Sequence, residues 1–223
     1  MAHTMEKNFV RRTNLGNAIV WMAIGAFLTT GCGTSNKPML PAGVQNPTQA
    51  SDETGNTVSH PEYANWSRFP EGAHVVRYRV TTNENGKVEV TSTWKLKKRS
   101  EDFVEIVSQV NVQRSGEELQ ENLPETTRFP STFRLPKGLT EEFFQLPSAK
   151  AKKVGEESLE IHGKSIITEV FEWTESNETG PMTVKLWRSD DVPGRIVRQE
   201  MLIESSQTKT IEELHEVNWN GNQ

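Results

Sequence analysis

The sequence has few of the residue patterns that form catalytic and metal sites. Cys32 is the only cysteine among 223 residues, so a monomer can form no disulfide bond within itself. The five histidines are scattered, and none has a spacing to another that suits a metal ion. No Gly-x-Ser-x-Gly nucleophile motif is present. The sequence therefore predicts neither an enzyme nor a cofactor or metal centre.

The sequence has no excess of positive charge. The formal net charge is -5, from 25 Lys and Arg against 30 Asp and Glu. Two basic clusters, at residues 95–99 and 150–153, stand beside turns and acidic runs, which is typical of solvated charges. This balance gives no support for nucleic-acid binding, and we expect no nucleic-acid partner.

No apolar run reaches the ~20 residues that a permanent membrane-spanning helix needs. The longest stretch, residues 18–28, follows a basic segment at 7–12 and leads through small residues at 29–31 to Cys32. A positive start, a short apolar centre and small residues at the end are typical of a secretory signal. A lone thiol in an exported protein needs an explanation, and a thioether bond to a lipid is one.

The ending Thr29-Thr30-Gly31-Cys32 resembles the lipobox of bacterial lipoprotein precursors. The resemblance implies cleavage between Gly31 and Cys32 and a lipid on Cys32 that anchors the chain to a membrane. The family prefers an aliphatic residue three positions before the cysteine, where this chain has Thr29. The alternatives are an ordinary secretory signal with a chance cysteine, or an uncleaved N-terminal anchor.

The resemblance also implies a location in the bacterial cell envelope. In enterobacterial sorting, Asp after the lipidated cysteine retains a protein at the inner membrane, and this chain has Gly33 there. The implied destination is the outer membrane, facing the periplasm. Arg11-Arg12 resembles a twin-arginine signal, but Thr13-Asn14-Leu15 lacks the residues that follow in that pattern.

Composition divides the chain into three parts. Residues 1–31 form the predicted signal peptide, and residues 32–63 form the lipidated cysteine with a disordered tether rich in Pro, Gly, Ser and Thr. About 30 residues of flexible chain span roughly 30 Å. Residues 64–220 form the predicted β-rich domain.

The domain shows a period of two residues in its apolar pattern, which predicts strands with one wet face. Asn85-Gly86 indicates a hairpin, and Val192-Pro193-Gly194-Arg195 indicates a type II turn. Turns about every ten residues predict an all-β fold, mainly antiparallel, as a curved sheet or incomplete barrel of about seven to nine strands. We expect Val76, Tyr78 and Val80 to face the core.

Residues 115–153 interrupt this rhythm with four prolines, which sheets admit only at edges and bulges. We expect a crossover with a short helix at residues 139–146. One interpretation is a functional or mobile connection. The other is a padded crossover that caps an open end of the sheet, with the phenylalanines Phe129, Phe133, Phe143 and Phe144.

Three short motifs have structural explanations. Gly163-Lys164-Ser165 resembles the end of a phosphate-binding loop, but Ser158 stands where that loop needs Gly. Glu213 and His215 share a strand face, which a solvated charged strand explains without a metal. Asp190-Asp191 precedes the Pro193-Gly194 turn, where carboxylates commonly accept backbone N–H groups.

Aromatic residues in or beside the predicted strands support two functional hypotheses. The first is an apolar small-molecule site in a half-barrel, with Tyr78, Trp94 and Trp187 on the ligand face. The second is core packing by these rings in an interaction domain whose outer face meets an envelope protein.

The signal, together with the turn pattern Trp187-x-Ser189-x-x-Val192-Pro193-Gly194, resembles envelope lipoproteins. The predicted layout is similar to that of lipoprotein-carrier half-barrels of the LolA/LolB type.

Overall fold

The computed structural model describes residues 56–136, 138–177 and 180–221. The predicted signal peptide, Cys32 and residues 33–55 of the predicted tether lie outside this range. Within the described residues, no helix has both the length and the apolar character needed to cross a membrane.

A large antiparallel sheet dominates the described part of the chain. Its strands are β2 (His74–Asn83), β3 (Gly86–Arg99), β4 (Phe103–Arg114), β5 (Gln120–Glu121), β6 (Glu125–Pro130), β8 (Lys152–Ile161), β9 (Lys164–Asn177), β10 (Gly180–Arg188), β11 (Ile196–Ile203) and β12 (Thr208–Asn218). The smaller elements are β1 (Thr57–Ser59), α1 (Pro61–Trp66), β7 (Thr132–Arg134), α2 (Glu141–Gln145) and the short 3-10 helix Glu204–Ser206.

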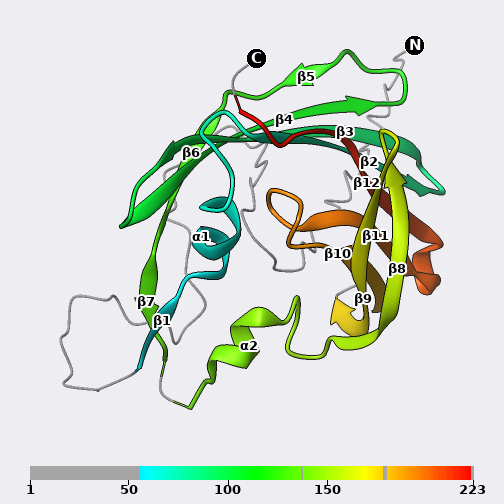
Figure 1. The fold of residues 1–223 in the computed structure, drawn as a ribbon. Helices are drawn as coiled ribbons and strands as arrows, with labels where there is room; N and C mark the ends of the chain where they lie inside the picture. Colours follow the sequence, from blue (N-terminus) through cyan, green and yellow to red (C-terminus); the bar gives the residue numbers. More distant parts are fainter. Residues whose placement is uncertain (1–55, 137, 178–179, 222–223) are drawn as a thin grey trace, which may run out of the picture.

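The strand order is β5-β4-β3-β2-β12-β11-β10-β9-β8, and β6 also pairs with β4. Two meanders, β2–β4 and β8–β12, are joined where β2 pairs with β12. The sheet curves over α1 without closing (Figure 1). This confirms the predicted fold class. The sheet has ten strands because the Pro-rich crossover contributes β5 and β6, which pair with β4.

The hairpin turns explain how neighbouring strands are aligned. The predicted hairpin is present, and Asn83 pairs with Gly86 across the two-residue loop Glu84-Asn85, which begins one residue before the Asn85-Gly86 pair. His162 and Gly163, at φ 50° and 72°, form a second two-residue turn between β8 and β9. Gly194 has φ 70°, and the Arg195 N–H donates to the Val192 carbonyl at 2.9 Å, which confirms the predicted turn.

The two sides of the sheet differ in what covers them. We call the inner face the side that packs on α1, and the outer face the opposite side. On β3, Leu96 faces inward, since it is buried in the core. On β2 the prediction is wrong. Val75 and Arg77 are buried, and Arg77 is paired with the core residue Leu214, so Val76, Tyr78 and Val80 lie on the outer face.

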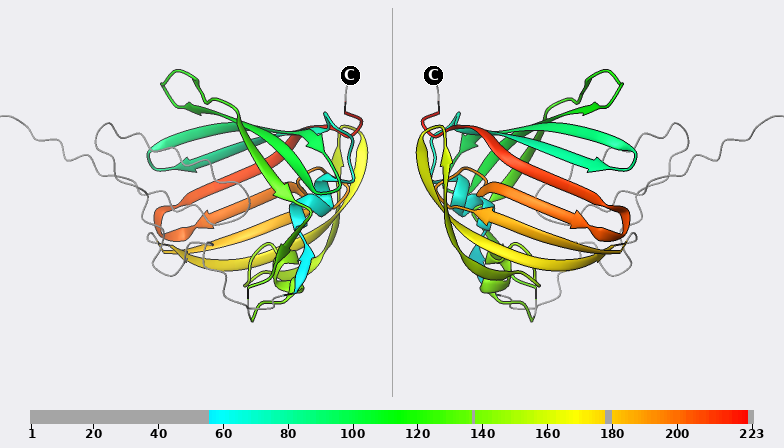
Figure 2. Two further views of the ribbon diagram at one scale, coloured as in Figure 1. Left: turned by 90° about the vertical axis from the view of Figure 1, so that its left-hand side faces the viewer. Right: turned by 90° about the vertical axis from the view of Figure 1, so that its right-hand side faces the viewer.

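A core under the closed end of the arch joins both meanders to α1. We call this the closed-end core; its buried members are Trp66, Phe69, Ala73, Val75, Leu96, Val104, Ile106, Ile166, Val192, Val197 and Leu214. In Figure 2, α1 lies at one end of the strands, and the turns after β2 and β11 lie at the other. The inner face is thus filled by α1 at one end only.

The predicted tether and the predicted helix have different bounds in the structure. The last residues of the predicted tether, 57–63, contain β1 and the start of α1, so the ordered domain begins before residue 64. His60 caps α1, because its Nδ1 accepts from the Glu62 N–H at 3.2 Å. The predicted helix at 139–146 is present as α2, within the crossover.

Candidate functional site

The three residues predicted to form one apolar ligand face do not share a face. Trp94 is on the inner face, directly opposite Val75, and packs against the closed-end core. Tyr78 and Trp187 are on the outer face, in a cross-strand row that runs from Tyr78 through Glu213 and Arg198 to Trp187. The structure therefore corrects the predicted site, because a period of two cannot show which face a strand turns inward.

Charged side chains contact both aromatic residues of the outer face. Trp187 is buried beneath Lys185 and Arg198, whose cationic groups lie 4.9 and 5.2 Å from its ring. Its indole N–H donates to a Glu157 carboxylate oxygen at 2.8 Å. The Tyr78 hydroxyl donates to Glu89, which raises the tyrosine pKa. Charged side chains therefore cover Trp187, whereas Tyr78 is exposed and its hydroxyl is engaged by Glu89.

The apolar surface that remains lies on the inner face of β9–β11. We call it the inner apolar cluster; its buried members are Ala151, Phe171, Trp173, Met182, Val184 and Leu186, with Leu146, Ile196, Met201 and Ile203 packed around them. Trp173, Val184 and Met201 lie side by side on three adjacent strands. The cluster is separate from the closed-end core.

The segment around α2 lies over this cluster and is weakly held. α2 has five residues, none of them buried, and its N-cap Thr140 makes no side-chain hydrogen bond. Isolated helices this short are unstable in water. The segment is attached at a few points. Leu146 packs on the cluster, Pro147 is buried, Phe144 contacts the Phe133 ring at 5.1 Å, and the Gln145 carbonyl accepts from Arg188 at 2.6 Å. The cover of the cluster is therefore a short helix without a buried residue of its own.

The other end of the inner face is closed by polar contacts between α1 and the Val192–Arg195 turn. The Asn65 side chain donates to the carbonyls of Asp190 and Val192, both at 3.2 Å, and accepts from the Gly194 N–H at 2.7 Å. Arg77 reaches the same turn from β2, and donates to the carbonyls of Gly194 and Ile196 at 3.1 and 3.3 Å. This end is fixed.

Charges inside the arch balance one another. Burial raises the pKa of Glu62, although nearby Arg195 and Arg77 oppose the shift. Burial lowers the pKa values of Arg77 and Arg195, while Glu212 opposes the shift at Arg77 and Asp190 opposes it at Arg195. A shifted carboxyl inside a concave face is a typical functional-site signal. Here the arginines bind backbone carbonyls and carboxylates, so the cluster serves the fold.

Asp190 and Asp191 pair with arginines. The Asp190 carboxylate lies 3.1 Å from Nε of Arg195, and the exposed Asp191 carboxylate lies 3.3 Å from Arg68. The predicted capping contact comes instead from Ser189, whose hydroxyl accepts from the Asp191 N–H at 3.4 Å. Asp190 thus pairs within the turn, and Asp191 forms an exposed ion pair with Arg68, which follows α1.

The remaining motifs form no chemical site. Gly163-Lys164-Ser165 begins a strand, and the Lys164 ammonium lies 3.9 Å from the Trp219 ring. The His215 carbonyl lies 2.6 Å from the His162 ring nitrogen. Over the described ranges, no group of three or more His, Cys, Asp or Glu could hold a metal ion.

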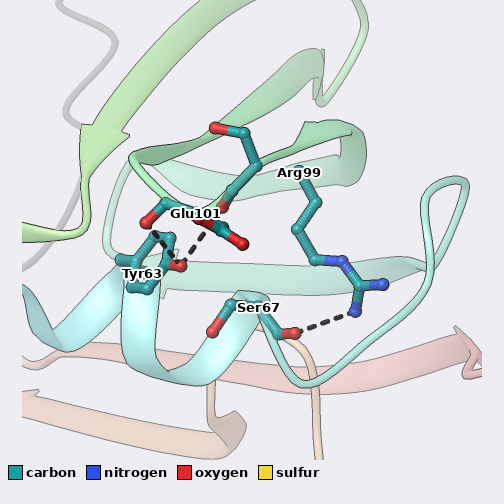
Figure 3. A pocket seen from close by; sticks show the side chains of 5 residues that line it. Tyr63, Ser67, Arg99 and Glu101 are labelled. Carbon is teal, nitrogen blue, oxygen red and sulfur yellow. Dashed lines mark hydrogen bonds between the residues drawn. The ribbon is translucent and has the colours of Figure 1, made fainter.

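Two shallow hollows lie outside the arch. One, of about 400 Å³, lies between α1 and the β3–β4 turn and is lined by Tyr63, Ser67, Arg99, Ser100 and Glu101 (Figure 3). There the Tyr63 hydroxyl donates to the carbonyls of Ser100 and Glu101, and Arg99 donates to the Ser67 carbonyl. These polar groups already have protein partners. The second, of about 310 Å³, lies beside Lys164 and Trp219.

No protein-family model matches the sequence, and no curated protein matches it. Among solved structures, the chain is similar to an exported protein with a YmcC-like fold from Bacteroides fragilis. The TM-score is 0.41 at 10% identity, over 67% of this chain and 97% of that one.

Two further structures are similar to this chain. One is the lipoprotein LppX of Mycobacterium tuberculosis, with a TM-score of 0.35 at 12% identity over 72% of this chain and 95% of that one. The other is MucB in complex with the periplasmic part of MucA, with a TM-score of 0.40 at 15% identity over 72% of this chain and 54% of that one.

Proposed function

We propose that this chain is a lipid-anchored binding protein of the bacterial cell envelope. A lipid on Cys32 holds it at the membrane, and an apolar chain binds against the inner apolar cluster. The binding proposal is based on one observation, the way in which the α2 segment covers the inner apolar cluster. A short segment that ends at Pro147 lies over the apolar surface and is attached at a few points, namely Leu146, the buried Pro147, the contact of Phe144 with Phe133 and one hydrogen bond from Arg188.

The anchoring part rests on the sequence. The apolar run ending in Thr29-Thr30-Gly31-Cys32 supports cleavage before Cys32 and acylation of its thiol. Cys32→Ser should leave the membrane fraction or stay unprocessed. Intact-mass analysis of the parent should show a protein that begins at Cys32 and carries added lipid, and an unmodified mass would refute the anchor. Gly33 favours the outer membrane, which density-gradient separation of the two membranes tests.

Binding would exchange one apolar contact for another. When the α2 segment moves away, Leu146 leaves the cluster, and an acyl chain or similar apolar group takes its place beside Met201 and Ile203. Arg188 then loses its Gln145 partner, while its ion pair with Glu169 at 3.2 Å remains. Its guanidinium lies 4.8 Å from the Phe171 ring, at the margin of the cluster, where it would meet a polar or anionic end of the ligand.

Native mass spectrometry of the protein purified from its own cells tests this binding. We expect a co-purified lipid with the parent, and its loss with Met201→Glu, which places a carboxylate among the cluster residues. Leu202→Glu is the matched control, since Leu202 is on the same strand but exposed. Parent protein that carries no lipid and does not bind a fluorescent fatty acid would rule out the apolar site.

The second candidate is an interaction domain without a ligand. The observation that favours it is that the cluster is already covered, with Phe171, Trp173 and Val184 all buried. A partner in the envelope would then meet the outer face, where ion pairs cover the sheet. The same lipid measurement separates the two, because only the first predicts a difference between the Met201 and Leu202 variants.

A further inference from the structure

We propose that the edge formed by β1, β7 and α2 rests on the surface of the bilayer that holds the lipid anchor. This inference depends on the anchoring at Cys32 proposed above and adds the partner of one surface of the domain. It rests on a row of aromatic rings, on the exposure of that row's outer end, and on the place where the anchored chain enters the domain.

The aromatic row runs from the surface to the core. Phe143 contacts Phe144 with ring centres 5.5 Å apart, and Phe144 contacts Phe133 at 5.1 Å. Phe133 contacts His60 at 5.5 Å, and His60 contacts Phe129 at 5.2 Å. Phe129 packs against the closed-end core. The outer rings are therefore supported from behind by the folded domain.

The outer end of the row is exposed. Phe143 has 40% of its surface accessible, and Leu139, just before α2, has 37%. None of the residues of α2 is buried. Aromatic and aliphatic side chains of this kind gain free energy at a membrane interface by leaving water. Figures 1 and 2 show α2 and β1 together at the lower edge of the molecule.

The anchored chain enters the domain at this edge. The Leu135 N–H donates to the Asn56 carbonyl at 3.0 Å, and Val58 pairs with Phe133 in the β1–β7 ladder. Residues 33–55 separate Cys32 from this point, and a chain of that length reaches at most about 80 Å. A lipid on Cys32 therefore tethers the described domain at the edge that carries the aromatic row.

Local charge selects the kind of surface. Glu141 and Glu142 are exposed on α2, and Arg134 is exposed on β7, so among these three described side chains the carboxylates outnumber the cation. Anionic lipid would repel the two carboxylates, so the surface that fits is zwitterionic. Two apolar side chains bind a bilayer weakly by themselves. The anchor removes this limit, because tethering raises the effective concentration of the surface to the millimolar range, roughly.

The single thiol permits a direct test. The mature chain, residues 32–223, is coupled through Cys32 to a maleimide lipid in phosphatidylcholine vesicles, and hydrogen exchange is compared with the uncoupled chain mixed with the same vesicles. We expect peptides covering residues 138–146 to exchange about tenfold more slowly when coupled, the factor that partial burial of two large apolar side chains provides. Peptides covering residues 115–124, at the opposite edge, should be unaffected.

Matched variants define the contact. Leu139→Ser with Phe143→Ser should abolish the slowing, whereas Leu123→Ser, which removes an apolar side chain that is 88% exposed elsewhere, should preserve it. Unchanged exchange on coupling, or slowing that persists in the double variant, would overturn the inference. The chemical coupling supplies an anchor whether or not cells acylate Cys32. This test of the membrane-facing edge is therefore independent of the intact-mass test for acylation of Cys32.

Discussion

At the scale of single residues, Arg77 shows how a charged side chain serves a thin core. It is buried on the inner face and donates to the carbonyls of the Val192–Arg195 turn. Glu62 and Glu212 lie near its charge. A buried arginine is tolerable when carboxylates and carbonyls satisfy it, and removing one partner of such a group is costly. Arg77 therefore ties β2 to the β10–β11 turn.

Gly194 is the position where backbone conformation and packing coincide. Gly194→Val should cost on the order of 1–3 kcal/mol from strain at its positive φ. A Cβ there would also lie 2.8 Å from Nη2 of Arg77 and 3.2 Å from the Trp66 ring. Asp191→Asn should change stability little, because its ion pair with Arg68 is exposed. Urea melts of both variants check this order, and a parent-like melt for Gly194→Val would contradict the turn's role.

His60 links stability to pH. Burial lowers its pKa below the ordinary 6.5, and its neutral ring caps α1. Between the lowered folded pKa and the unfolded value, the unfolded chain binds more protons, so stability should fall as pH drops through that window. His60→Asn keeps a capping oxygen and should lose less stability between about pH 7 and about pH 5. Parallel losses in parent and variant, measured by urea melts at each pH, would show that His60 is not the titrating group.

At the scale of elements, β8 shows how an edge of the sheet is protected from pairing, and α2 shows how an apolar part of its face is covered. β8 is an edge strand that is exposed along most of its length and carries charges with a register shift between Lys153 and Gly155. Charges and irregularity on an edge oppose pairing with another sheet. At α2 the chain instead covers an apolar surface with a short helix held at few points.

The weak attachment of α2 predicts local opening. Leu146→Ser removes its contact with the inner apolar cluster, and should speed hydrogen exchange of residues 141–146 about tenfold, as expected when a partly buried leucine is lost. Exchange in β12, at the centre of the sheet, should stay unchanged. If β12 also accelerated, the segment would be part of the global fold and could not act as a displaceable cover.

At the scale of the molecule, the closed-end core makes one domain of two meanders. Val75 and Leu96 come from the first meander, and Val197 and Leu214 come from the second. Trp66 of α1, with 1% of its surface accessible, packs among them. The pairing of β2 with β12 completes the connection through backbone hydrogen bonds.

Trp66→Ala should therefore destabilise both meanders together, by about 3–5 kcal/mol, the usual cost of truncating a large buried aromatic side chain. The parent and the variant should each unfold in one transition, with circular dichroism and tryptophan fluorescence giving the same midpoint. Separate midpoints in the variant would mean that the meanders fold independently and that α1 joins them only loosely.

Local signals in the sequence were sufficient for the fold class and for several turns. The alternation of apolar residues and the turn signals Asn85-Gly86 and Pro193-Gly194 each involve only a few residues, so they can be recognised without the rest of the chain. The helix at α2 also follows from its own residues. The proposed anchor depends on residues 18–32, which lie outside the described residues and remain a prediction.

Only the tertiary structure decided the inner face of β2, the pairing of β2 with β12, and the separation of Trp94 from Tyr78 and Trp187. In β2, both alternating sets mix apolar and polar residues, and a shift of one residue exchanges the faces. The long aliphatic part and the buried charge of Arg77 become favourable inside only because the Val192–Arg195 turn, more than 100 residues away, supplies carbonyls. Contacts between such distant segments leave no local pattern in the sequence. The inner apolar cluster and its cover therefore appear only in the folded chain.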